Sequence, residues 1–253
     1  MNSLLRSKYA SVVLPTVTTL VLFILWEIIV KIFHIPSFNV PAPSAIWSAA
    51  VEKSQPLIEN SLVTVQTTMV GFSFAIVAGI FLGFLIGYSR LAYMILYPIL
   101  VGFNTIPKAA LAPLFALWFG LGFLPAVLTA FLLAFFPIAA NVALGLETVE
   151  PEMKDVLRAL GASQLELFRK VGLPHSMPYL FASLKVAVSF AFIGSVISET
   201  VASDKGVGYL VVSASASFDV PLGFAGLLTL SCLGIMLYSF FAILEKYVVH
   251  WAR

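Results

Sequence analysis

The chain has 253 residues, of which 60% are hydrophobic and only 10% are charged. Soluble domains average about 25% charged residues, and no soluble fold has enough interior to bury this much apolar surface. The net charge of +2 is too small to indicate nucleic-acid binding, so the composition predicts an all-α, polytopic membrane protein.

The N-terminal part combines a basic flank with a long apolar stretch. Arg6 and Lys8 precede the apolar residues 12–33, an order that a secretory signal peptide also has. The stretch is longer than a signal-peptide core, and no small-x-small cleavage site follows it. We therefore expect a retained first transmembrane helix.

Further spans are predicted wherever about 20 predominantly apolar residues follow one another. The sequence predicts about six spans in one transmembrane domain over residues 1–253, at about 12–33, 62–88, 91–118, 122–146, 178–200 and 222–248.

Two longer segments between these spans are expected on the outer side. Residues 34–61 contain four prolines, and Pro43-Ser44 is expected to start a short interfacial helix at 45–52. Residues 201–221 are half apolar, with Gly206 and Gly208 allowing tight turns. This segment is expected to be re-entrant or interfacial, near the mouth of a pore.

Lysine and arginine predict the orientation, because they are enriched in cytoplasmic loops. Lys108 and Lys185 lie inside spans and are not counted. Three basic residues fall on one side of the membrane: Lys31, Lys53 and Lys205. Nine fall on the other side: Arg6, Lys8, Arg90, Lys154, Arg158, Arg169, Lys170, Lys246 and Arg253. Both termini and the loop at 147–177 are therefore expected in the cytoplasm.

The second span carries glycine at every fourth residue, at Gly79, Gly83 and Gly87. This doubled GxxxG pattern makes a flat face that another helix can approach closely. We interpret it as a packing surface rather than a ligand site.

The third span is interrupted by Pro107 and Pro113, and each is expected to kink the helix and free carbonyl groups that need partners. Lys108 directly follows the first proline. Either it snorkels to an interface, or it faces a cavity that attracts an anionic or polar solute. Asn104 and Trp118 are candidates to line the same cavity.

Two acidic residues also fall within spans. Glu27 is expected near the outer interface with no special role. Glu199, beside Ser198 and one turn after Ser195, is expected to pair with Lys108, to cap the outer segment or to line the translocation path, and a structural ion pair or hydrogen bond is favoured. The candidate residues of the translocation path are Asn104, Lys108, Trp118, Ser198 and Glu199.

The loop at 147–177 is the only long polar stretch. Pro151 suits the start of a helix, and Gly161 a break before a second one. Ser163 and Glu166 form a capping-box pattern, and Pro174 is expected to stop the second helix. The spacing predicts an amphipathic helix pair offered to a cytoplasmic partner.

This loop resembles the conserved loop of ABC-importer permeases, in which Glu-Ala-Ala, Gly and Leu-Pro stand at fixed spacing. Here the pattern reads Asp155-Val156-Leu157, then Gly161, Val171 and Leu173-Pro174, so the leading triplet departs from the family. Other segments resemble the sulfonate/nitrate/taurine branch, in the family's order: PAPSAIW at 41–47, IPKAALAPLFALWFGLG at 106–122, GAS at 161–163, LPHSMPY at 173–179 and SETVASDKGVGYLV at 198–211.

The resemblance implies a type I importer permease in a bacterial plasma (inner) membrane. It implies a homodimer, two ATPase subunits below and a periplasmic or lipid-anchored solute-binding protein above. The residues it implies for coupling to the ATPase are Asp155, Leu157, Arg158, Ala159, Gly161, Ala162, Ser163, Phe168, Leu173 and Pro174. ATP and Mg would bind the partner ATPase, because this chain has no GxxxxGK[ST] loop and is not itself expected to be an enzyme.

The resembling branch handles sulfonates, taurine, nitrate, bicarbonate, aromatic carboxylates and pyrimidines, and Lys108 mildly favours an anion. One alternative is a gradient-driven secondary transporter, which normally shows paired membrane acids or inverted repeats. Another is an intramembrane enzyme, but the three histidines lie in separate segments and neither HExxH nor GxSxG occurs. No metal site or catalytic residue is predicted.

Overall fold

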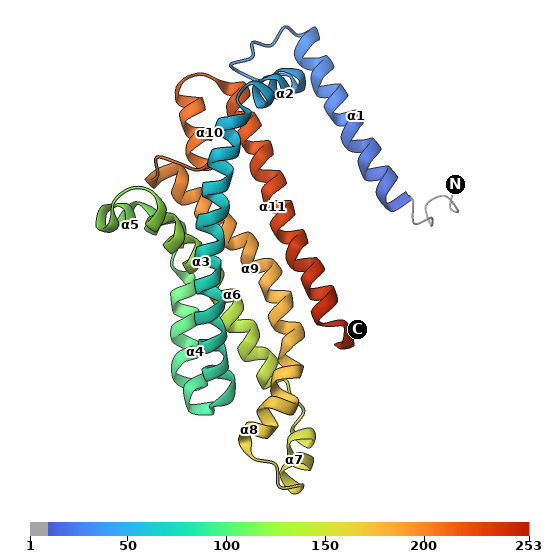
Figure 1. The fold of residues 1–253 in the computed structure, drawn as a ribbon, viewed down its shortest axis with the longest axis vertical. Helices are drawn as coiled ribbons and strands as arrows, with labels where there is room; N and C mark the ends of the chain where they lie inside the picture. Colours follow the sequence, from blue (N-terminus) through green and yellow to red (C-terminus); the bar gives the residue numbers. More distant parts are fainter. Residues whose placement is uncertain (1–9, 253) are drawn as a thin grey trace. The chain divides into compact units, whose positions relative to one another are not determined.

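A computed structural model describes residues 10–252, and all regular elements within that range are helices. Figure 1 shows them in chain order. They are α1 (Ala10–Ile32), α2 (Pro43–Glu52), α3 (Ser54–Tyr88), α4 (Arg90–Thr105), the 3-10 turn η2 (Lys108–Leu111), α5 (Ala112–Phe119), α6 (Phe123–Glu147), α7 (Pro151–Ala159), α8 (Gln164–Leu167), the π-helical turn η3 (Phe168–Gly172), α9 (Leu173–Ala202), α10 (Val207–Ala216), α11 (Val220–Val248) and the 3-10 turn η4 (His250–Ala252).

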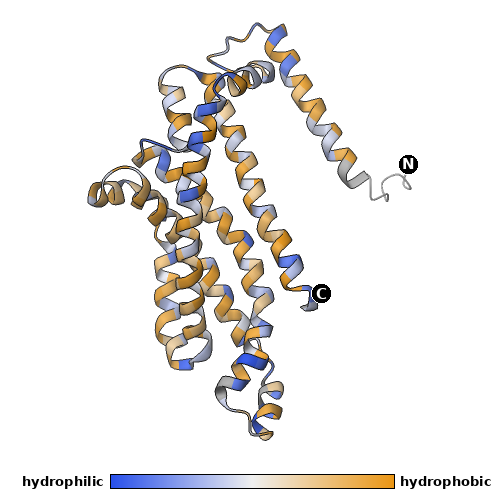
Figure 2. Ribbon diagram, viewed as in Figure 1, coloured by the Kyte–Doolittle hydropathy of each residue, from blue (hydrophilic) through white to orange (hydrophobic). Residues whose placement is uncertain are grey.

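The number of spans agrees with the prediction. Within residues 10–252, five helical stretches are long and apolar enough to cross a membrane, and a bent pair makes six if it counts as one span. In the view of Figure 2, hydrophobic residues colour most of each long helix, whereas α7 and α8 carry several hydrophilic residues. Apolar surface all round a helix is typical of a helix that faces lipid or other membrane helices.

The chain divides into two compact units. The first comprises Met1–Ile58 and Leu210–Leu228, and the second comprises Glu59–Tyr209 and Thr229–Arg253. The core of the first unit consists of Ile46, Leu57, Ala214, Leu222 and Ala225.

The expected short helix in the first unit is confirmed as α2, with Pro43 in its first turn. Glu27 stabilises the start of α2. The Glu27 carboxylate accepts hydrogen bonds from the backbone amide of Ser44 at 2.9 Å and from the Ser44 hydroxyl at 2.7 Å. The same carboxylate pairs with Lys31 at 2.7 Å. The expectation that Glu27 has no special role is therefore wrong, because it fixes the entry into α2.

Close helix packing forms the second unit. Glycines of α3 lie against α6, and α6 lies alongside α9 (Figure 1). A Cβ atom added at Gly79, Gly83 or Gly87 would come within 2.5–2.8 Å of α6 atoms. The doubled GxxxG pattern is thus confirmed as a packing surface. An ion pair between Lys185 of α9 and Glu245 of α11 joins two further helices of this unit.

The third predicted span is broken at Pro107, as expected. The axis turns by 75° between Arg90–Thr105 and Lys108–Phe119. Pro113 does not add a second kink, because it stands in the first turn of α5. A proline there costs no helical hydrogen bond, since the amides of a first turn have no intrahelical partner.

The fifth span begins earlier than predicted. α9 has 30 residues and follows directly on α8 and the π-helical turn η3. Pro174 does not stop the second loop helix, because it lies in the first turn of α9. Proline has no amide hydrogen to donate, and the wider π-helical turn before it tolerates the missing hydrogen bond. The chain therefore stays helical from Gln164 to Ala202.

Candidate coupling surface and translocation-path residues

The first loop helix, α7, ends in a glycine-dependent motif. Gly161 has φ of +81°, a conformation that favours glycine. Its amide donates to the Arg158 carbonyl at 2.9 Å, and the Ala162 amide donates to the Leu157 carbonyl at 3.0 Å. These are the two bonds of a Schellman motif. The predicted break at Gly161 is confirmed, and its backbone sets the angle at which the second helix leaves.

The second loop helix starts with the predicted capping box. The Ser163 amide donates to the Glu166 carboxylate at 2.8 Å, while the Glu166 amide donates to the Ser163 hydroxyl at 3.3 Å. These bonds from Ser163 hold the pKa of Glu166 below its ordinary value. The two helices are therefore joined by two capping motifs that follow each other directly, which makes a short and well-defined corner.

The surface of this corner mixes charge with apolar groups. Asp155 and Arg158 form an exposed ion pair at 3.1 Å. Val156 and Leu160 are 61% and 77% exposed. A shallow depression of about 500 Å³ lies alongside, lined by Glu150, Glu152, Met153, Val156, Leu157, Lys170 and Val171. Such a surface suits a protein partner, since exposed apolar patches with polar rims mark interaction sites.

The other predicted coupling residues divide into two groups. Ala159, Leu173 and Pro174 are exposed, and Leu157 is half-buried. Phe168 instead packs edge-on against Phe84 of α3, with ring centroids 4.6 Å apart. Phe168 therefore anchors the second loop helix to the membrane bundle rather than presenting its ring to a partner.

Lys108 closes the end of the broken helix. Its amine donates to the backbone carbonyl of Asn104 at 3.0 Å and to the side-chain oxygen of Asn104 at 2.8 Å. The Thr105 hydroxyl donates to the Gly102 carbonyl at 2.7 Å. The carbonyls freed at the end of α4 thus find partners, and the cation sits at the negative end of the helix dipole.

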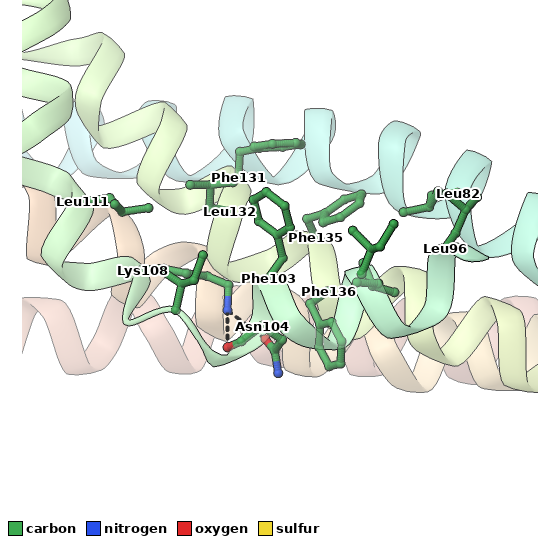
Figure 3. Close-up of a pocket in the computed structure, with 13 residues that line it drawn as sticks. Leu82, Leu96, Phe103, Asn104, Lys108, Leu111, Phe131, Leu132, Phe135 and Phe136 are labelled. Atoms are coloured by element: carbon green, nitrogen blue, oxygen red, sulfur yellow. Dashed lines mark hydrogen bonds between the residues drawn. The ribbon is translucent and has the colours of Figure 1, made fainter. Parts of the chain in front are cut away.

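Asn104 and Lys108 also share a cavity of about 300 Å³. Its walls come from α3, α4, η2 and α6, and almost all lining side chains are apolar, as Figure 3 shows. Trp118 is not among the lining residues, and it is 63% exposed on α5. The structure therefore brings together two of the three residues that were expected to share a cavity.

Glu199 lies in a buried hydrogen-bond network on α9, with only 1% of its surface exposed. Its carboxylate accepts from the Thr64 hydroxyl at 2.9 Å, the Gly208 amide at 3.0 Å and the Ser195 hydroxyl at 3.3 Å. The Thr67 hydroxyl lies 2.5 Å from that of Ser195. Glu199 does not pair with Lys108, because its carboxylate accepts from these neighbours and the Lys108 amine donates to Asn104 instead.

The same network caps α10. The Val207 amide donates to the Thr64 hydroxyl at 2.9 Å, and the Gly206 amide donates to the Asn60 side chain at 2.7 Å. With the Gly208 bond to Glu199, three successive amides at the start of α10 are satisfied by side chains. Gly206 has φ of +100°, and a Cβ atom there would overlap the Glu199 carboxylate. The expectation that Glu199 caps the outer segment is confirmed.

Asn60, Thr64 and Thr67 were not predicted as site residues. The available signal is the spacing of Thr64, Thr67 and Thr68, which places three hydroxyls on one face of an apolar helix. Ser198, a predicted path residue, is fully buried, and its hydroxyl has no hydrogen-bond partner among the described residues.

The family of the chain follows from a comparison with known proteins. Residues 75–250 match the model of the binding-protein-dependent transport system inner membrane component. The chain belongs to this family. It is the permease of an ABC importer and a multi-pass membrane protein, and a gradient-driven transporter is not favoured. The family is a transport component and not an ATPase.

Curated relatives cover nearly the whole permease. It is 32% identical to the formylaminopyrimidine transport permease ThiX of Halalkalibacterium halodurans, over 94% of this chain and 96% of that one. It is also 32% identical to the riboflavin transport system permease RibX of Chloroflexus aurantiacus, over 99% and 94%. The putative aliphatic sulfonates permease SsuC of Bacillus subtilis is 28% identical, over 91% and 84%.

A solved structure supports the fold. The MetNI methionine ABC transporter in an inward-facing conformation superposes with a TM-score of 0.68 and 21% identity, over 78% of this permease and 98% of that chain. The expected importer permease fold is therefore confirmed.

Proposed function

We propose that two identical copies of this permease form the translocation path of an ATP-driven importer in a bacterial inner membrane. Two ATPase subunits bind the cytoplasmic loop at 151–174, and a periplasmic or lipid-anchored binding protein delivers the solute from the other side. ATP and Mg bind the ATPase subunits and not this chain. Family membership supports the ATPase and the binding protein as partners.

The observation that carries this proposal is the construction of the loop. Two capping motifs fix the angle between α7 and α8, and α8 continues through η3 into the 30-residue helix α9. A displacement of the loop by an ATPase would therefore pass directly into a membrane-spanning helix, as in rigid-body switching of packed elements. Such motion can alternate the access of the solute path between the two sides.

The transported solute is proposed to be a small polar or anionic molecule. Relatives are named for formylaminopyrimidine, riboflavin, aliphatic sulfonates and nitrate. We include taurine, bicarbonate and aromatic carboxylates in the same range. Asn104, Lys108, Trp118, Ser198 and Glu199 remain the proposed residues of the path, with Asn104 and Lys108 at its cavity.

The test is co-purification of the tagged permease from its native membrane. Gly161→Val should reduce the co-purifying ATPase by about tenfold, because a non-glycine residue at this φ costs about 1–2 kcal/mol and tilts the second loop helix. Gly102→Val is the matched control, since no atom lies within 4 Å of its added Cβ.

Mass spectrometry of the purified complexes provides the measurement. We expect an ATPase in equal amount with the unaltered permease and with Gly102→Val. A permease that purifies alone in mild detergent with its fold intact would overturn the proposal. Equal ATPase recovery with both glycine variants would remove the coupling role of the corner at Gly161.

A further inference from the structure

The cavity beside the broken third span is a candidate ligand site. It measures about 300 Å³ and is lined from α3, α4, η2 and α6, all within the second unit. This volume lies at the lower end of the range for small-molecule sites, which are usually apolar with a few convergent polar groups. The break in the span also favours a ligand site here, since discontinuous membrane helices often form solute sites.

Aromatic rings dominate the wall of this cavity. Phe103, Phe131, Phe135 and Phe136 gather between Lys108 at one end and Leu82 and Leu96 at the other (Figure 3). The rings of Phe131 and Phe135 are tilted relative to each other, and their centroids lie 5.6 Å apart. An aromatic ring of a ligand can make edge-to-face or offset-stacked contacts with such a wall. These contacts add binding free energy to that from burying apolar area.

The only positive charge of the lining is Lys108. Its ammonium group has three N–H donors, and the two hydrogen bonds to Asn104 occupy two of them. One donor remains for a ligand among the described contacts. Asn104 holds the amine in place at the end of the cavity opposite Leu82 and Leu96 (Figure 3).

The lining disfavours a small inorganic anion. Such an ion needs several donors to replace its water, whereas Asn104 and Lys108 are the only polar side chains among the lining residues. An apolar wall with one cation instead matches a molecule with one apolar part and one negative group.

We infer that this cavity binds an organic anion carrying an aromatic ring, with the ring among the phenylalanines and the anionic group on Lys108. The inference rests on the proposed function, because it takes this anion as the solute that the permease moves. It narrows the proposed substrates to aromatic carboxylates, aromatic sulfonates and similar anions.

Three probes separate the contributions of ring and charge. Benzenesulfonate has both, methanesulfonate has the charge alone, and benzyl alcohol has the ring alone. Binding to the full chain in lipid nanodiscs is measured by saturation-transfer NMR, with empty nanodiscs subtracted. We expect benzenesulfonate to bind at least about tenfold more tightly than either other probe.

Two variants test the residues. Lys108→Met should weaken benzenesulfonate binding by about tenfold, since it removes a charged hydrogen-bond donor. Phe103→Leu should weaken it by about threefold, since it removes one ring contact. Phe103 is 65% exposed, so its loss spares the core. The matched controls are Lys205→Met and Phe190→Leu, which lie outside the cavity and should bind as the unaltered chain does.

Several outcomes would overturn the inference. They are equal binding of methanesulfonate, equal binding of benzyl alcohol, and unchanged binding by both cavity variants. A phospholipid that stays in the cavity through purification and is displaced by no probe would also overturn it. Because the binding test needs no ATPase, failure here with the ATPase still co-purifying removes this inference alone. Loss of the ATPase partner would remove the proposed function and leave the binding result standing.

Discussion

Two charged side chains within the predicted spans of this permease are held by local hydrogen bonds, and of the two Glu199 is buried and Lys108 is half-buried. Lys108 closes the end of α4 through Asn104, and Glu199 accepts from three hydroxyls and one amide. A charge in a membrane is costly unless it is paired or solvated, and these two are solvated by protein dipoles. Each residue therefore stabilises an irregular part of the backbone, the break for Lys108 and the start of α10 for Glu199.

Removal of the Glu199 carboxylate should destabilise the permease strongly. Glu199→Ala leaves the Gly208 amide buried without its acceptor and removes one of the two acceptors of the Thr64 hydroxyl, so we expect a loss of about 3 kcal/mol. Thermal unfolding in detergent measures the effect. Glu147→Ala, at an exposed end of α6, is the control and should change stability by less than about 0.5 kcal/mol. Equal effects of the two variants would show that the network contributes little.

At the scale of elements, small residues decide how closely the helices approach. The glycines of α3 touch α6 directly, and Gly145 of α6 lies against Ser176 and Tyr179 of α9. Without a hydrophobic drive between membrane helices, such close van der Waals contact is a main source of their association. The three helices thus pack closely, and the loop helices are attached to them through α9.

Substitution of Gly83 tests this packing. Gly83→Val would place a side chain within 2.5 Å of the Ala139 carbonyl, and overpacking of this kind costs about 1–3 kcal/mol. The expected result is a lower unfolding temperature in detergent and a smaller yield of monodisperse protein. Gly102→Val, with open space around it, carries the same change in helix propensity and provides the comparison. A Gly83 variant as stable as this control would contradict the packing role.

At the scale of the whole molecule, the lysine and arginine count and the helix lengths lead to one orientation. α9 has 30 residues and is about 45 Å long, which exceeds the apolar thickness of a membrane of about 30 Å. Its two ends must therefore lie on opposite sides. Because basic residues precede α9, we predict that its first end and the loop at 147–177 lie in the cytoplasm.

Cysteine labelling tests this orientation. In a Cys232→Ala background, a membrane-impermeant maleimide added to intact spheroplasts should label Lys205→Cys, because Lys205 follows the outer end of α9. Arg169→Cys should react only after the membrane is opened. Both side chains are exposed, so the labelling depends only on whether the maleimide reaches that side of the membrane. The reverse pattern would invert the topology and place the loop away from the ATPase.

Local sequence signals were sufficient for the spans, the break at Pro107 and the corner at Gly161. Each of these depends on residues close together in the chain: apolar runs, a proline without its amide, and a glycine followed by a capping box. The prediction that Pro174 stops the second loop helix was wrong, because a local signal does not show what the following residues do. A proline that follows a helical stretch reads as a stop, but here the next helix starts on it without a loop.

The sequence by itself thus determined the membrane class, the number of spans, the family pattern and the construction of the corner at Gly161, because these follow from composition and short-range spacing. Only the tertiary structure decided that Phe168 points into the bundle, that Glu199 meets Thr64 rather than Lys108, and that Trp118 lies away from the cavity of Asn104. Those outcomes depend on which helix faces are brought together in the fold, and the bond between Thr64 and Glu199 joins residues 135 positions apart in the chain. Spacing within one helix shows which side chains share a face, and the packing of helices selects the partner that this face meets.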